Sequence, residues 1–148
     1  MQRFIFNRCQ AEKTTFMRQL FATFFCLILL FACKKTSTDF IISDGTYAGT
    51  FQRLTPAGGQ ISTVSITFSG NTWTGQSQVA KYPALCNGTY NVNSSGSATF
   101  ENACIWTADF DWTLILKGDY QVKVDGNALE MSREYSNGSK DIYLLRKE

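Results

Sequence analysis

The sequence predicts an all-β fold, an antiparallel up-and-down β-barrel of about eight strands. Three observations support this prediction. From residue 44 onward, apolar and polar residues alternate with a period of two, the pattern of strands that bury one face. Turn residues interrupt the alternation roughly every 8 to 12 positions. Connections are short in the second half, where Asp125-Gly126 and Asn137-Gly138 are hairpin signals, and closing such a meander removes its exposed edges.

Residues 1–32 are expected to form a cleaved signal helix. Residues 20–32 contain a single polar residue, Thr23, and follow Arg18. This apolar stretch is shorter than the roughly 20 residues that a membrane-spanning helix needs, but it matches the apolar region of a signal peptide. A buried core helix is the other interpretation, and the terminal position and the flanking charge disfavour it.

The segment Leu30-Phe31-Ala32-Cys33 resembles the cleavage box of bacterial lipoproteins, in which the cysteine becomes the first residue and carries lipid. The resemblance implies lipid attachment at Cys33, a lipidated tether over residues 33–43 and a folded domain over 44–148. Several acyl chains together anchor a protein stably to a membrane, whereas one chain does not. A plain secretory signal cut near Ala32 is the alternative.

The expected strands follow in order along the domain. They cover residues 47–52, 63–68, 72–75, 89–92, 98–100, 112–117, 120–124, 129–132 and 142–146. Residues 103–110 break the alternation, and we expect a short helical turn there, packed on one end of the barrel.

Charge and cysteine content limit the possible chemistry. Residues 33–148 contain 10 basic and 11 acidic side chains, and this balance argues against nucleic acid as a partner. Cys86 and Cys104 are left in an exported domain, which favours a disulfide over two free thiols. The absence of histidine excludes Ser-His-Asp and Cys-His catalysis. We expect no metal, no cofactor and no enzymatic activity; Asp109 and Asp111 could form a carboxylate pair, but capping of a turn explains them better.

The segment Asp44-Gly45-Thr46-Tyr47-Ala48-Gly49-Thr50-Phe51 resembles the opening strand of lipocalin-like barrels. In that family a Gly-x-Trp places an aromatic ring as a plug in the closed barrel end, and Tyr47 stands at the tryptophan position. The resemblance implies that Arg146 or Arg133, from a late strand, caps this ring. With the cleavage box, the chain resembles small lipoproteins of Bacteroidota, and Lys34-Lys35 after the cysteine then favours the outer membrane, facing the periplasm.

The leading hypothesis for function is a membrane-anchored barrel that binds a small ligand, either an apolar molecule or a glycan fragment. The candidate binding residues are aromatics near predicted strand ends, namely Trp73, Tyr82, Trp106 and Trp112. Small residues on the inward face, Gly49 and Gly75, favour a cavity. The alternative is a filled barrel that binds another protein, as an inhibitor or an accessory subunit of the cell envelope, and an exposed Tyr82 would favour it.

Overall fold

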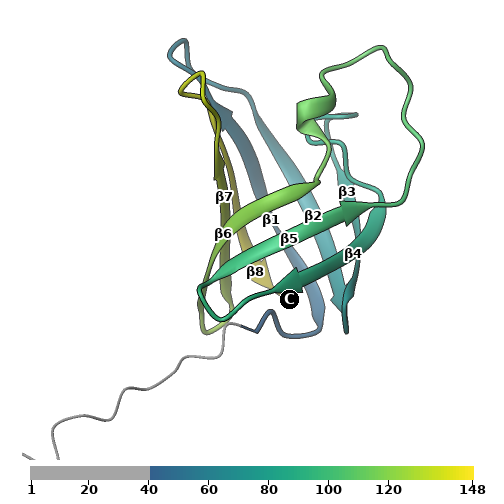
Figure 1. The fold of residues 1–148 in the computed structure, drawn as a ribbon, viewed down its shortest axis with the longest axis vertical. Coiled ribbons are helices and arrows are strands. Elements are labelled where there is room, and N and C mark those ends of the chain that lie inside the picture. Colours follow the sequence, from purple (N-terminus) through teal and green to yellow (C-terminus); the bar gives the residue numbers. More distant parts are fainter. Residues whose placement is uncertain (1–40) are drawn as a thin grey trace, which may run out of the picture. The chain divides into compact units, whose positions relative to one another are not determined.

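The structure, a computed structural model, describes residues 41–148, which form a closed antiparallel barrel. Each strand pairs with the next one in the chain, and the last strand pairs with the first (Figure 1). The elements are β1 (Gly45–Leu54), β2 (Ile61–Ser69), β3 (Thr72–Ser77), β4 (Asn87–Val92), β5 (Ser97–Asn102), the 3₁₀ turn η1 (Trp112–Leu114), β6 (Gly118–Asp125), β7 (Ala128–Glu134) and β8 (Lys140–Lys147). The predicted fold class is confirmed.

The signal helix expected over residues 1–32, the expected lipid attachment at Cys33 and most of the expected tether fall on residues outside those that the structure describes. In the part of the chain that the structure describes, no helix is long and apolar enough to cross a membrane.

The alternation of the sequence sets the two faces of each strand. In β2, Val64, Ile66 and Phe68 are buried, whereas Ser65 and Thr67 between them are on the outer face and less buried. Tight turns between strands use left-handed glycines, with φ of 57° at Gly70 and 56° at Gly126, a conformation that glycine adopts without steric cost.

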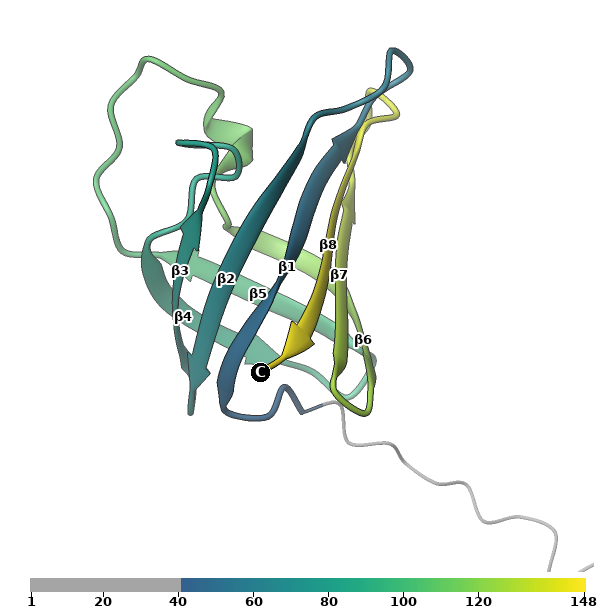
Figure 2. The same cartoon turned by 180° about the vertical axis from the view of Figure 1, so that it is seen from behind.

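Closure of the barrel joins the two ends of the domain. β1 lies between β2 and β8 (Figure 2), and its pairing with β8 runs from Tyr47 opposite Lys147 to Leu54 opposite Lys140. On the other side of the barrel, β4, β5 and β6 cross obliquely (Figure 1).

The interior of the barrel is filled with side chains. The buried hydrophobic cluster comprises Ile42, Tyr47, Phe51, Val64, Ile66, Phe68, Trp73, Tyr90, Ala98, Phe100, Leu116, Tyr120, Val122, Leu129, Met131, Tyr143 and Leu145. Many of the aromatic rings meet edge to face, as Phe100 does with Tyr120 at a centroid distance of 5.7 Å. An eight-stranded barrel has an interior just wide enough for such a filling.

The long connection over residues 103–117, here called the strap, differs from the prediction. The helical turn expected within 103–110 lies instead at Trp112–Leu114, and the strand expected over 112–117 does not form. The Asp111 side chain accepts a hydrogen bond from the Thr113 backbone N–H at 2.9 Å, and this cap starts a turn where the alternating sequence alone suggested a strand. The strand begins at Gly118.

A disulfide joins Cys86 to Cys104, as predicted. β4 pairs with β5 with Gly88 opposite Asn102, so two positions further out the same register places the cysteines opposite each other. The bond closes the open end of this hairpin and fixes the first residues of the strap.

Candidate functional site

A charged pair lies on the inward face of the barrel at the strap end. Arg53 of β1 and Asp141 of β8 are directly paired in register. The arginine donates from Nε to Oδ1 at 2.6 Å and from Nη2 to Oδ2 at 2.7 Å, a two-pronged geometry that gives strong, directional bonds. Only 1% of the Asp141 side chain is exposed.

The same arginine also holds the strap. Its Nη1 donates to Asp111 Oδ2 at 2.9 Å and to Thr113 Oγ1 at 2.7 Å, and its Nη2 donates to the Thr113 carbonyl at 2.9 Å. The Tyr135 hydroxyl donates to Asp141 Oδ2 at 2.7 Å. We call this group of Arg53, Asp141, Tyr135, Asp111 and Thr113 the arginine clasp.

The two strap carboxylates are held separately. Asp109 pairs with Lys81 at 2.7 Å, and Asp111 pairs with Arg53. Hydrogen bonds from Lys81 and Thr107 lower the pKa of Asp109 to about 2, and hydrogen bonds from Thr113 together with the Arg53 charge lower the pKa of Asp111. Each acid therefore fixes the strap to a different cation, and they do not face one another as a catalytic pair.

The four predicted ligand-binding aromatics are not gathered in one place. Trp73 belongs to the core, and its Nε1 donates to the Glu101 carbonyl at 3.1 Å. Tyr82 is half-buried against Phe51, at a centroid distance of 5.3 Å, and its hydroxyl donates to the Gln60 carbonyl. Tyr82 is thus less exposed than expected for a residue that contacts a partner.

The two remaining tryptophans lie on the strap. Trp106 is half-buried, donates to Asn102 Oδ1 at 2.9 Å and packs edge to face on Phe110. Trp112 is 56% exposed, and its Nε1 donates to the Thr107 carbonyl at 3.0 Å. Of the four predicted residues, Trp112 is the one that is more than half exposed.

The predicted plug is placed only in part as expected. Tyr47 is buried against Phe68 and donates to the Ser43 carbonyl at 3.0 Å. Arg146 is exposed and pairs in register with Ala48, at an outward position of β8, so its side chain leaves the barrel instead of covering this ring. Arg133 lies over Tyr120 and Tyr135.

The inward glycines do not line a cavity. A Cβ at Gly49 would lie 2.0 Å from the Leu144 carbonyl oxygen, and one at Gly75 would lie 3.3 Å from the Leu85 side chain. Close backbone approach at Gly49 and packing at Gly75 take up the space that the sequence suggested for a ligand.

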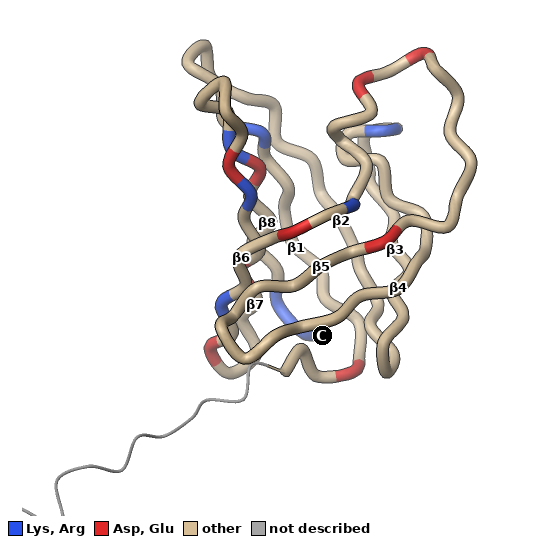
Figure 3. Tube along the Cα trace, in the orientation of Figure 1, with Lys and Arg blue, Asp and Glu red and all other residues tan. Residues whose placement is uncertain are grey.

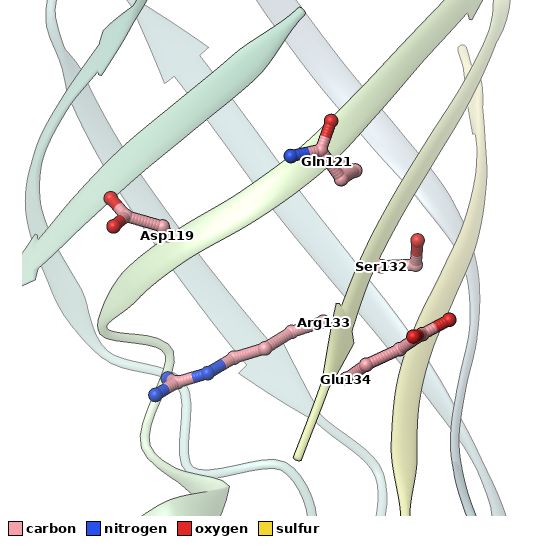
Figure 4. Close-up of a pocket in the computed structure, with 5 residues that line it drawn as sticks. All are labelled: Asp119, Gln121, Ser132, Arg133 and Glu134. Carbon is pink, nitrogen blue, oxygen red and sulfur yellow. The ribbon is translucent and has the colours of Figure 1, made fainter. Parts of the chain in front are cut away.

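A hollow on the surface lies where β6 and β7 separate. Their ladder ends at Gln121 opposite Ser132, although β6 begins at Gly118 and β7 continues to Glu134. A pocket of about 470 Å³ occupies this fork (Figure 4), and it is lined by Asp119, Gln121, Ser132, Arg133 and Glu134. A second pocket of about 410 Å³ is lined by Trp112, Thr113, Ile115, Lys117, Gly118 and Arg133. Because both pockets share Arg133, we describe them together as the fork groove.

Arg133 is the central side chain of the fork groove. It extends from β7 across the gap towards the chain that enters β6 (Figure 4), and its Nη1 donates to the Lys117 carbonyl at 2.7 Å. Its guanidinium carbon lies 4.9 Å from the centre of the Tyr135 ring, the same distance as that of Arg53. Tyr135 therefore connects the arginine clasp to the fork groove.

Comparison with known proteins assigns no family to this barrel. The chain matches no family model, no curated protein and no solved structure. Within residues 41–148, no group of three or more His, Cys, Asp or Glu side chains is placed to hold a metal ion. The chemistry of the fork groove thus follows from its own groups, which are guanidinium donors, carboxylate and amide acceptors, and one flat aromatic face.

Neither the arginine clasp nor most of the fork groove was predicted. One signal for both is a charged residue at an inward position of an alternating strand. Arg53 follows Phe51 two positions on, Asp141 precedes Tyr143 by two, and Arg133 follows Met131 by two. Such charges cannot be buried without partners. Each of them therefore indicates that other polar residues lie beside it at the end of the barrel.

Proposed function

We propose that this chain is an exported, lipid-anchored binding protein whose barrel is a solid scaffold and whose binding surface lies outside, at the strap end. The single observation that carries the proposal is the filled interior, where side chains such as Phe51, Phe100 and Tyr143 occupy the volume that a ligand would need. The fork groove and the strap then offer the surface for binding.

Three further features support the proposal. The Cys86–Cys104 disulfide suits an oxidising compartment outside the cytoplasm. Acidic and basic positions are interspersed at the end of the barrel where β7 turns into β8 (Figure 3), and such a mixed surface favours neither nucleic acid nor an anionic membrane surface. The strap itself is fixed by the disulfide, by Lys81 and by Arg53, so a groove beside it is ordered before any ligand arrives.

A protein partner in the cell envelope is the second candidate. Ile105 on the strap is fully exposed, and a large apolar side chain that projects from an ordered loop can insert into a pocket of a partner. In this alternative the strap, and not the fork groove, makes the principal contact.

Native mass spectrometry of the protein purified from its own host tests the solid scaffold. We expect the mass of the lipid-bearing polypeptide less two hydrogens for the disulfide, with no further apolar molecule. An additional apolar molecule that leaves on gentle activation would contradict a solid interior and favour the ligand-holding barrel.

Metabolic labelling with a radioactive fatty acid tests the anchor. The wild-type protein is expected to take up label and sediment with membranes, and Cys33→Ser to do neither. Cys86→Ser is the matched control, because it removes a cysteine that is in a disulfide and leaves the cleavage box intact. Label in Cys33→Ser would overturn the proposed attachment site.

A further inference from the structure

The fork groove also indicates the class of its ligand. We propose that it binds a neutral saccharide, whose ring stacks on Trp112 and whose hydroxyl groups bond to the polar side chains around Arg133. This inference rests on the proposed function, because it needs an outer binding surface.

Trp112 supplies the apolar part of the site. More than half of the residue is exposed, and its indole N–H is already bonded to the Thr107 carbonyl at 3.0 Å. The polar edge of the indole ring is thus hydrogen-bonded within the strap, and a ligand would contact the apolar face of the ring. The C–H face of a sugar ring is flat and weakly apolar, so it suits such a platform, and its hydroxyl groups suit the polar side chains of the other pocket that Arg133 lines.

Arg133 supplies hydrogen-bond donors that are already in position. Its Nη1 bond to the Lys117 carbonyl and its packing over Tyr135 hold the guanidinium in place. A guanidinium carries five N–H donors, so donors beyond the one used on Lys117 can serve a ligand. A fixed donor loses little side-chain entropy when the ligand binds.

Acceptors and further donors line the same pocket as Arg133 (Figure 4). The Asp119 and Glu134 carboxylates accept hydrogen bonds, whereas the Gln121 amide and the Ser132 hydroxyl both donate and accept. A sugar hydroxyl is itself both donor and acceptor, so it can use this mixed set fully. A lipid tail can use none of it.

The charges of the groove favour a neutral ligand. Arg133 and Lys117 are basic, Asp119 and Glu134 are acidic, and their charges cancel. Asp119 also accepts a hydrogen bond from Thr99, and Glu134 is paired with Lys140 at 3.2 Å. A phosphate or carboxylate ligand would have to approach these acids, whereas a neutral sugar pays no such electrostatic cost.

Saturation-transfer NMR on the oxidised, lipid-bearing protein, purified from its host in a detergent without a sugar headgroup, tests the proposal. The probes are four neutral trisaccharides, namely cellotriose, maltotriose, xylotriose and chitotriose. We expect transfer to at least one of them, a loss in affinity of about tenfold or more, the equivalent of 1.4 kcal/mol, in Trp112→Ala, and a smaller loss in Trp112→Phe, which keeps a flat face.

Two further variants define the site. Gln121→Ala is expected to weaken binding about 2- to 10-fold, as the loss of one hydrogen bond does. Leu144→Ala is the matched control, because Leu144 is a large, exposed side chain on β8 that lines neither pocket of the groove, and it is expected to bind as the wild type does. Far-UV circular dichroism verifies that each variant is folded.

The outcomes separate this inference from the proposed function. No transfer to any of the four saccharides, or transfer that persists unchanged in Trp112→Ala, would overturn the saccharide site. A photo-crosslinking residue in place of Gln121 that captures a protein in host cells, together with no saccharide binding, would overturn the saccharide and leave an outer binding surface. An apolar molecule found inside the barrel would contradict the proposed function itself.

Discussion

Arg53 and Asp141 face each other across the β1–β8 seam, with both carboxylate oxygens within 2.7 Å of guanidinium nitrogens. The pair is inward-facing, and the aspartate is almost fully buried. A buried charge that has lost its partner is far more costly than the pair itself is stabilising. The stability of the barrel should therefore fall sharply when one member of the pair is replaced and the other is kept.

Replacement of Arg53 by methionine is expected to lower the free energy of unfolding by about 3–5 kcal/mol, because the buried Asp141 carboxylate then lacks an opposite charge. Urea unfolding monitored by circular dichroism measures the change. The double variant Arg53→Met/Asp141→Leu should recover much of the loss, since no unpaired charge remains. A double variant as unstable as the single one would contradict this explanation.

Replacement of Tyr143 by phenylalanine is expected to leave stability unchanged or to raise it by about 1 kcal/mol. Within residues 41–148, no group forms a hydrogen bond with the buried Tyr143 hydroxyl, so this hydroxyl contributes no hydrogen-bond energy to the folded state. The matched control is Tyr47→Phe, which removes a hydroxyl that donates to the Ser43 carbonyl and should cost about 1 kcal/mol. Equal losses in both variants would show that the Tyr143 hydroxyl does have a partner.

Replacement of Gly49 by alanine is expected to destabilise the barrel by about 3 kcal/mol or more, as severe overpacking does. The added methyl group would meet the backbone of β8, 2.0 Å from the Leu144 carbonyl oxygen, and a backbone cannot move aside as a side chain can. Gly75→Ala is the control, because the nearest atoms there, at 3.3 Å, include the flexible Leu85 side chain. Thermal unfolding of the two variants should therefore differ clearly.

Acid should loosen the strap between about pH 4 and pH 2. The pKa values of Asp109, about 2, and of Asp111 are lower in the folded chain than the ordinary value of 3.8. The unfolded chain then binds more protons in this window, so the stabilisation is complete above it and is lost as the pH falls through the folded values. The effect of Asp109 is small because that side chain is largely exposed to solvent.

The urea midpoint between pH 5 and pH 2 measures this dependence. The variant Asp109→Asn/Asp111→Asn should show a shallower fall than the wild type, because neither amide titrates. An identical fall in both proteins would assign the acid sensitivity to other carboxylates.

The sequence predicts the barrel well because side chains in a strand point alternately to its two faces. The buried face and the exposed face therefore appear in the sequence as alternating apolar and polar residues. It fails at residues 112–117, where Trp112, Leu114 and Leu116 alternate as in a strand but the Asp111 cap and the contacts of Thr113 with Arg53 form a turn. Those contacts join residues about sixty positions apart, and local patterns do not contain them.

The site is less predictable than the fold. An inward glycine such as Gly49 has the same appearance in the sequence whether it borders a cavity or a neighbouring backbone. The fork between β6 and β7 depends on where their hydrogen-bonded pairing ends. That end, at Gln121 opposite Ser132, has no recognisable pattern in the sequence of either strand. In β7 the signal is the charge at Arg133, which follows the apolar inward residues Leu129 and Met131.

The seam between β1 and β8 also constrains when the protein can fold. A growing polypeptide that lacks residues 140–147 has no partner for one side of β1 or for one side of β7, and its apolar inner surface stays open to water. Contacts between such distant segments form late and slowly. A chain of this kind does not close its barrel until its last strand has been synthesised, which is compatible with the export proposed above.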